Sequence, residues 1–149
     1  MPGISSPLYQ ISLQYAADST SLFAGTVTTD TKLAIDSSHV ITSKGMSVDN
    51  SNDRILIPGS STNNWEVSFS ATVWSGSTGN HEIRMKVKSD GTTKLQSECF
   101  LRNEDATFLG SIPLEIPLTG GEYVTLEHFL NDNSRAYDVR SYQMRLVLR

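Results

Sequence analysis

Few residues in this sequence could act in catalysis, and they are widely spaced. The 149 residues include one cysteine, Cys99, and three histidines, His39, His81 and His128. A catalytic nucleophile needs a neighbouring base and a third group that orients the base, and none of these four residues lies in such a motif. Cys99 falls within the segment QSECFLR, where a buried thiol acts as a small apolar side chain. The sequence therefore predicts no catalytic residues and a protein that is not an enzyme.

Three clusters of side-chain oxygen atoms could bind a hard cation such as Ca²⁺. They consist of Asp49, Asn50, Asn52 and Asp53; Glu104 and Asp105; and Asn131, Asp132 and Asn133. The first cluster has the spacing of an EF-hand loop, but Arg54 stands where that loop requires glycine, and its final glutamate is absent. Asparagine and aspartate are also ordinary turn residues. We therefore expect no cofactor and no metal, with a Ca²⁺ site as the alternative.

The elements that must position these side chains are strands, because apolar and polar residues alternate. The alternation is strictest in residues 65–74, where five apolar side chains share one side: Trp65, Val67, Phe69, Ala71 and Val73. Further strands are predicted at 9–15, 21–29, 32–35, 54–57, 81–89, 93–102, 111–118, 122–130 and 137–149, and two short ones within 39–49. The 21 serines and 14 threonines suit strands and turns better than helices. This pattern predicts an all-β sandwich or barrel.

Local signals predict how some of the strands connect. Asp90–Gly91 predicts a tight hairpin between the strands on either side. In strand 111–118, Pro113 and Pro117 share one side, and the apolar residues on the other side are Ile112, Leu114, Ile116 and Leu118. Because proline cannot donate a ladder hydrogen bond, we expect this strand at the edge of a sheet.

Charge is sparse and unevenly distributed along the chain. The formal net charge is −4, which argues against nucleic acid as a partner. Residues 1–75 carry three bases against six acids, and a neighbour can cover such a weakly charged surface at low desolvation cost. One side of the predicted strand 81–89 carries Glu82, Arg84, Lys86 and Lys88. We interpret that side as a solvated face, with contact to an acidic surface as the alternative.

The predicted location follows from what the sequence lacks. A single cysteine excludes an intrachain disulfide, and no Asn-X-Ser/Thr sequon or secretory leader is recognisable. No apolar run is long enough to cross a bilayer, so we expect no membrane insertion. Residues 1–9 include Pro2, Gly3 and Pro7 and predict an extended N-terminal arm, followed by a single domain at 10–149. These features predict a protein that is assembled in the cytoplasm.

The order of strands and turns resembles the C1q/TNF-like jelly-roll domain. The resemblance rests on ILIPGSSTNNWEVSFSATV, HEIRMKVKSDGTTK, LTGGEYVTLEHFL and SYQMRLVLR, and it covers residues 10–149. The tyrosine that commonly follows the Pro–Gly turn in that family is replaced here by a longer loop and Trp65. The resemblance implies a jelly roll of about ten strands and a compact homotrimer, and it does not imply an enzyme. Similar domains occur on phage particles as head fibres, decoration proteins and tail tips.

Two residues of the predicted strands are candidates for a subunit interface. By parity Trp74 lies on the polar side of its strand, and exposed indoles are enriched at interfaces. A bend near Ala71 would instead turn Trp74 into the core. His128 points inward by parity, either into the core or at a subunit interface.

Together these features favour a non-enzymatic structural protein of a virion. We expect a trimeric phage capsid decoration or head-surface protein that docks on the particle, with Pro2, Pro7 and Tyr9 of the arm as candidate contacts. One alternative is a receptor- or glycan-binding tip of a phage tail fibre, in which Trp74 or Tyr137 would stack on sugars. Another is a secreted C1q/TNF-like ligand, which the lack of a signal peptide disfavours.

Overall fold

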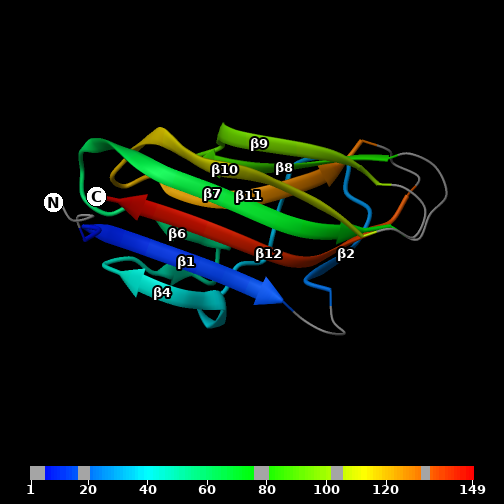
Figure 1. The fold of residues 1–149 in the computed structure, drawn as a ribbon, viewed down its shortest axis with the longest axis horizontal. Helices are drawn as coiled ribbons and strands as arrows, with labels where there is room; N and C mark the ends of the chain where they lie inside the picture. Colours follow the sequence, from blue (N-terminus) through cyan, green and yellow to red (C-terminus); the bar gives the residue numbers. More distant parts are fainter. Residues whose placement is uncertain (1–5, 17–20, 76–80, 102–105, 132–134) are drawn as a thin grey trace, which may run out of the picture.

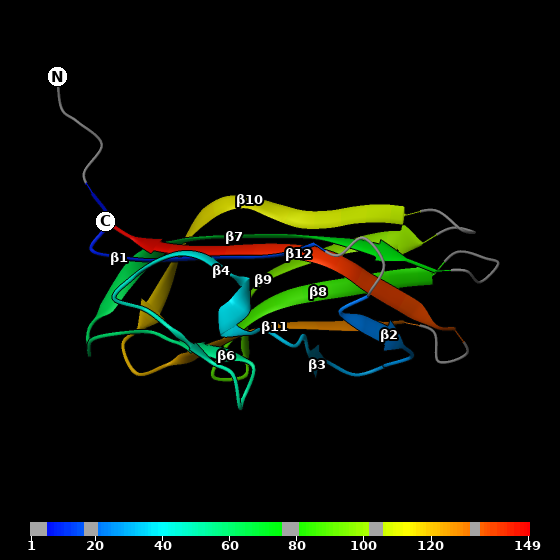
Figure 2. The same ribbon diagram turned by 90° about the horizontal axis from the view of Figure 1, so that it is seen from below.

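Two antiparallel sheets pack face to face (Figure 1; Figure 2). The computed structural model describes residues 6–16, 21–75, 81–101, 106–131 and 135–149. Sheet A contains, in spatial order, β10 (Ala106–Thr119), β7 (Thr62–Trp74), β12 (Tyr137–Leu148), β1 (Tyr9–Ala16) and β4 (Val40–Lys44), and β2 (Phe23–Gly25) also pairs with β12. Sheet B contains β5 (Val48–Asp49), β6 (Arg54–Leu56), β11 (Tyr123–Leu130), β8 (His81–Ser89) and β9 (Thr92–Leu101), and β3 (Thr31–Lys32) also pairs with β11.

This architecture confirms the predicted all-β jelly-roll sandwich. The described residues form twelve strands. The number exceeds the expected ten because it includes very short strands, such as the two-residue strands β3 and β5. The helical structure in this part of the chain is one 3₁₀ turn, η1 (Ser37–His39), capped by the Asp36 carboxylate, which accepts a hydrogen bond from Ser38 N. No helix of the described residues has the length and apolar character needed to span a membrane.

The core lies between the two sheets, where the inner sides of the alternating strands meet. On β7 the apolar set from Trp65 to Val73 is buried, as its parity predicts. It faces Ile83, Met85 and Val87 of β8 across the sandwich, and all three side chains are fully buried. Burial of these side chains supplies the main driving force for folding. In sheet A, the start of β1 and the end of β12 lie at the same end of the sandwich (Figure 1).

Two turns depend on backbone conformations that the sequence signals. Asp90 and Gly91 both have positive φ, at 45° and 79°, and connect β8 to β9 as the predicted hairpin. Gly120 follows β10 and packs directly against the carbonyl group of Gly59, so that a Cβ atom there would collide with backbone. The two strand ends can therefore approach each other only because residue 120 lacks a side chain.

Strand β10 lies at the edge of sheet A, as its prolines predict, but its register is not regular. Its pairing with β7 shifts between Ser111 and Leu114, which marks a β-bulge. Beyond the bulge Ile116 and Leu118 are buried, whereas Ile112 is 73% exposed and Leu114 is 43% exposed. The prediction that all four apolar residues share one side was therefore wrong for Ile112, because the bulge inserts an extra residue between it and the side shared by Leu114, Ile116 and Leu118.

Candidate interaction surface

His39, His128 and Cys99 make packing contacts, and the side chain of His81 lies outside the described part of the structure. His128 is fully buried, its Nδ1 lies 2.6 Å from the Tyr137 hydroxyl, and burial lowers its pKa to about 4. His39 Nδ1 lies 2.9 Å from the hydroxyl of buried Tyr142. Cys99 packs against the core, and burial raises the pKa of its thiol to about 11. These contacts place His128 in the core of the protomer and leave Cys99 with little reactive thiolate.

The first oxygen cluster is used by the turn that contains it. Asp49 Oδ2 accepts hydrogen bonds from Asn52 Nδ2 at 2.8 Å and from Arg54 Nε at 2.9 Å. Asn50 Oδ1 accepts a hydrogen bond from Ser37 N at 2.8 Å. Within the described ranges, no group of three or more histidine, cysteine, aspartate or glutamate side chains could hold a metal ion. Four residues of the other clusters lie outside those ranges: Glu104, Asp105, Asp132 and Asn133.

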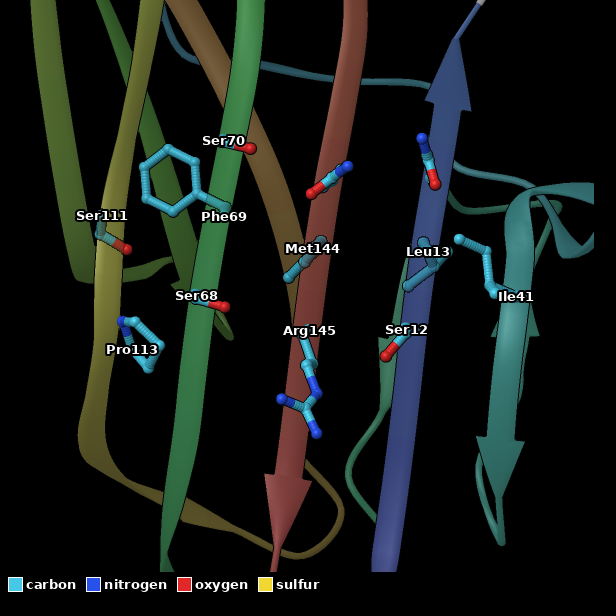
Figure 3. A pocket seen from close by; sticks show the side chains of 12 residues that line it. Ser12, Leu13, Ile41, Ser68, Phe69, Ser70, Ser111, Pro113, Met144 and Arg145 are labelled. Atoms are coloured by element: carbon cyan, nitrogen blue, oxygen red, sulfur yellow. The ribbon is translucent and has the colours of Figure 1, made fainter.

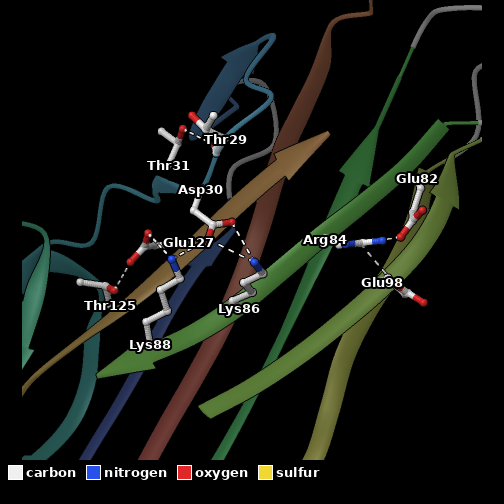
Figure 4. Close-up of polar contacts among 10 residues, drawn as sticks. All are labelled: Thr29, Asp30, Thr31, Glu82, Arg84, Lys86, Lys88, Glu98, Thr125 and Glu127. Atoms are coloured by element: carbon white, nitrogen blue, oxygen red, sulfur yellow. Dashed lines mark hydrogen bonds and ion pairs between the residues drawn. The ribbon is translucent and has the colours of Figure 1, made fainter. Parts of the chain in front are cut away.

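The outer side of β8 is covered by acidic side chains from neighbouring elements (Figure 4). Lys86 Nζ lies 3.1 Å and Lys88 Nζ 2.5 Å from the carboxylate of Asp30, which precedes β3. Lys88 also lies 3.4 Å from Glu127 of β11, and both lysine side chains are at most 15% exposed. The prediction of a solvated face was wrong here, because the alternation cannot show that Asp30 returns to cover these lysines.

Other charged side chains on this outer side also contact residues of the same chain. Arg84 Nε lies 2.6 Å from Glu82 and 3.3 Å from Glu98. On β6, the Arg54 guanidinium carbon lies 3.5 Å above the centre of the Tyr123 ring. We call the outer side of sheet B the charged face. Arg54, Arg84, Lys86 and Lys88 on this face are paired with carboxylates of the same chain, so covering them with another protein would require their desolvation.

The outer side of sheet A has a different chemistry (Figure 3). It carries a shallow cavity of about 360 Å³ across β10, β7, β12, β1 and β4. Six of the twelve lining residues carry uncharged hydroxyl or amide groups, namely Ser12, Gln14, Ser68, Ser70, Ser111 and Gln143. Arg145 is the charged member of that lining, and Ile41 and Pro113 add apolar surface. Toward the ends of the strands this side also carries ion pairs, of Glu66 with Arg145 and Arg149 and of Asp138 with Arg140. We call the part around the cavity the neutral face, because Arg145 is the charged residue in its lining.

Apolar side chains are exposed at both edges of the neutral face. On β10 they are Phe108, which is 78% exposed, and Ile112, which is 73% exposed, and we call these two residues the apolar ridge. At the opposite edge, Ile41 of β4 is 60% exposed, and at the end of the sheet where β1 begins, Leu8 is 62% exposed. Sequence reasoning missed the ridge because it placed Ile112 on the same side of the strand as Leu114, Ile116 and Leu118. Pro113, in the middle of an otherwise regular strand, was the signal that could have indicated the bulge.

Trp74 and Tyr137 are placed differently from each other. Trp74 ends β7 half-buried, while its neighbour Val73 keeps the inner side, so no bend turns the indole into the core. The guanidinium carbon of Arg140 lies 4.5 Å from the centre of the indole ring. Arg140 is the extra residue at a register shift of β12 between Val139 and Ser141. Tyr137 is only 1% exposed, so the expectation that it could stack on a sugar was wrong.

The predicted arm is fixed to the sandwich from Pro7 onward. The Pro7 carbonyl accepts a hydrogen bond from Lys44 Nζ at 2.6 Å. Tyr9 belongs to β1, stacks on Trp65 with ring centres 6.2 Å apart, and packs on Gly45, where a Cβ atom would meet its ring. Pro2 lies outside the described residues.

Three solved structures are similar to this chain over nearly its whole length. The globular domain of zebrafish complement 1qA protein has a TM-score of 0.61 at 12% sequence identity, covering 97% of this chain and 98% of that chain. Eiger TNF from S. frugiperda has a TM-score of 0.56 at 10% identity, covering 97% and 94%. PRD1 vertex protein P5 has a TM-score of 0.55 at 13% identity, covering 97% and 100%.

At these identities the likeness concerns the fold. It confirms the C1q/TNF-like jelly roll that the order of strands and turns predicted. No protein-family model matches the sequence, and no curated protein matches it.

Proposed function

We propose that the protein is a non-enzymatic structural protein of a virion surface, which assembles as a homotrimer and docks on the particle as a phage capsid decoration or head-surface protein. The contrast between the two outer faces carries this proposal. Ion pairs of Arg84, Lys86 and Lys88 cover the charged face around β8, whereas the cavity of the neutral face is lined by uncharged residues apart from Arg145. Covering uncharged polar groups costs less desolvation than covering ion pairs. The neutral face is therefore the one suited to contact another chain.

The apolar side chains around the neutral face favour a ring of copies. The apolar ridge lies at one edge, Ile41 lies at the other, and Leu8 lies at the end of the sheet where β1 begins. A contact between two different surfaces of identical chains is heterologous, and it forms a closed ring when the rotation between copies allows. In a threefold ring, the ridge of one copy packs on the neutral face of the next. This arrangement removes exposed apolar side chains from water and supports the homotrimer that the resemblance implies.

Docking is assigned to the arm and the residues that follow it. Leu8 is exposed between Pro7 and Tyr9, which are both held against the sandwich, so its side chain is presented on a fixed backbone. Leu8 N donates a hydrogen bond to the Leu148 carbonyl at 2.7 Å, and this bond places the arm beside the end of β12. A docking contact through Pro2 stays a prediction.

The likeness to PRD1 vertex protein P5 supports a role at a particle surface, since a vertex protein has this fold over 97% of the present chain. The other similar structures, a complement 1q domain and a TNF protein, fit a structural or ligand-like role more broadly. No catalytic or cofactor step belongs to the proposal. Its mechanism is geometric, through a rigid core, a seam between copies and an anchoring arm.

The proposal is tested on purified virus particles from the cells that produce this protein. An antibody against the chain should label the outer layer of intact particles, and quantitative mass spectrometry should give a copy number divisible by three per docking site. Replacing Leu8 by aspartate should release the protein from the particle, while the same replacement of Leu56, which is 43% exposed on sheet B, should not. Particles without the polypeptide would contradict the virion role, and labelling at the tail tip alone would favour the tail-fibre alternative.

A further inference from the structure

Residues 21–32, here called the strap, close one side of the sandwich between the two sheets (Figure 2). Its β2 pairs with β12 of sheet A over three residues, and its β3 pairs with β11 of sheet B over two. Two further backbone bonds hold it, from Leu22 N to the Val139 carbonyl at 2.9 Å and from Leu130 N to the Val27 carbonyl at 2.8 Å. These pairings are short, so the strap can open locally at a lower free-energy cost than the long β7–β12 ladder.

An ionic clasp fixes the outer end of the strap. Asp30 lies against Lys86 and Lys88 of β8, and Lys88 also contacts Glu127 (Figure 4). Burial raises the pKa of the Asp30 carboxyl, but its hydrogen bonds to Lys88 and Lys86 and their charges outweigh burial and hold the pKa below its ordinary value. Asp30 therefore stays ionised in mildly acidic solution, and the clasp stays charged there.

A buried histidine lies beneath the other end of the strap. The His128 ring lies 4.5 Å from the ring of Phe23 in β2, centre to centre, and the Phe23 ring lies 5.1 Å from that of Tyr137. Nδ1 of His128 is bonded to the Tyr137 hydroxyl. Nε2 is buried and has no hydrogen-bond partner among the described residues. The neutral imidazole thus fills an apolar site that only the closed strap completes.

The elements packed against His128 offer no counter-ion within the described chain. The strand register pairs it with Thr31 of β3 and Met85 of β8, and both are uncharged. On its own strand, Glu127 is engaged by Lys88 and Thr125 on the outer side. On the β12 side, the charged residues are Asp138, which accepts a hydrogen bond from Ser21, and the cation Arg135, whose carbonyl accepts one from Thr26.

We propose that His128 makes the strap an acid-sensitive latch: protonation of its ring releases residues 21–32 from the side of the sandwich while sheets A and B stay paired. A buried imidazolium without a counter-ion is costly, and opening the strap admits water to the ring. The release uncovers the apolar surface formed by Phe23, Val27 and Tyr137. The charged clasp opposes the release, so it sets how often the strap opens but not how the opening depends on pH.

The direction of the pH dependence follows from the lowered pKa of His128. Burial lowers the pKa of His128 from 6.5 to about 4 in the closed structure, so the open strap binds the proton more readily. The latch is fully stable above pH 6.5 and loses stability as the pH falls from 6.5 toward 4. Within this window each pH unit increases the opening equilibrium by up to about tenfold, and the whole window by roughly a hundredfold or more.

Hydrogen–deuterium exchange of the full chain between pH 7.5 and 4.5 tests the latch, with each rate corrected for intrinsic exchange. The amides of Leu22 and Leu130, which hold the strap, should lose about tenfold protection per pH unit below 6.5. Amides of the β7–β12 ladder serve as the internal reference and should keep theirs. Loss of protection by all amides together, or no pH dependence at Leu22 and Leu130, would overturn the proposal.

Two variants separate the latch from the clasp. His128→Gln keeps a polar partner for Tyr137 but cannot titrate, so the pH dependence at the strap amides should disappear. Asp30→Asn should raise strap exchange at every pH by a similar factor and leave the pH dependence unchanged. A His128→Gln protein that keeps the wild-type dependence would overturn the proposal. If that variant fails to fold, the comparison between strap amides and ladder amides in the wild-type protein still tests the proposal.

Discussion

Replacing Ile112 by serine is expected to dissociate the homotrimer without unfolding the protomer. Ile112 is 73% exposed in the single chain, so its removal takes little from the core of one copy. The proposed ring covers this side chain with the neutral face of the next copy. The substitution therefore acts on assembly and leaves folding nearly unchanged, because exposed substitutions usually change stability by less than about 0.5 kcal/mol.

The size of the effect follows from the area that the ring would cover. Fully burying an isoleucine side chain is worth about 1.5–3 kcal/mol, so covering the exposed part of Ile112 is worth roughly 1–2 kcal/mol for each contact. A trimer has three equivalent contacts and would lose about 3–6 kcal/mol. With about 1.4 kcal/mol for each factor of ten, the dissociation constant rises by roughly 10²–10⁴.

Sedimentation velocity over a series of concentrations measures this shift, and circular dichroism confirms that the β-sheet is retained. Leu56→Ser is the matched control, since Leu56 is 43% exposed on β6 of sheet B and lies outside the proposed seam. The reasoning is refuted if Ile112→Ser remains trimeric at the same concentrations as the wild type. It is equally refuted if Leu56→Ser dissociates the trimer as strongly.

Three further substitutions or reactions test the fold and the placement of its side chains. Gly120→Ala puts a Cβ atom into the Gly59 carbonyl, so the free energy of unfolding, measured by urea denaturation, should fall by at least about 2 kcal/mol. An unchanged unfolding midpoint would mean that the two turns do not touch. Phe69→Ala removes a ring that is 2% exposed, and it should lower the free energy of unfolding in the same assay by about 3–5 kcal/mol. A loss under about 1 kcal/mol would place Phe69 outside the core. Burial raises the pKa of Cys99 from 9.0 to about 11. Iodoacetamide at pH 8 should therefore react roughly a hundredfold more slowly with Cys99 in the folded chain than with Cys99 in the chain unfolded in urea. Equal rates would show an exposed thiol.

The sequence predicted most of the fold because its strands alternate with few interruptions. The buried set of β7 and the Asp90–Gly91 hairpin follow from side-chain parity and turn chemistry, which are local properties. The edge position of β10 followed from Pro113 and Pro117 for the same reason. A one-residue bulge is also local, but it reverses parity beyond it, and this reversal hid the exposure of Ile112.

The candidate surface was harder to predict because it depends on contacts between distant segments. Asp30 and Lys88 are far apart in the chain, and no periodicity indicates that the first covers the second. The environment of Tyr137 likewise depends on Phe23 and His128, which come from two other strands. The weak charge of the first half of the chain did indicate a surface that is cheap to cover, and the neutral face draws on β1, β4 and β7 from that half.

The most direct test of the central claim is the mass of the wild-type protein in solution, measured by light scattering across micromolar concentrations. The account predicts a single species of three times the chain mass of 16.4 kDa. A mass that stays at 16.4 kDa at every concentration, or a species of two chains, would contradict the threefold seam on the neutral face.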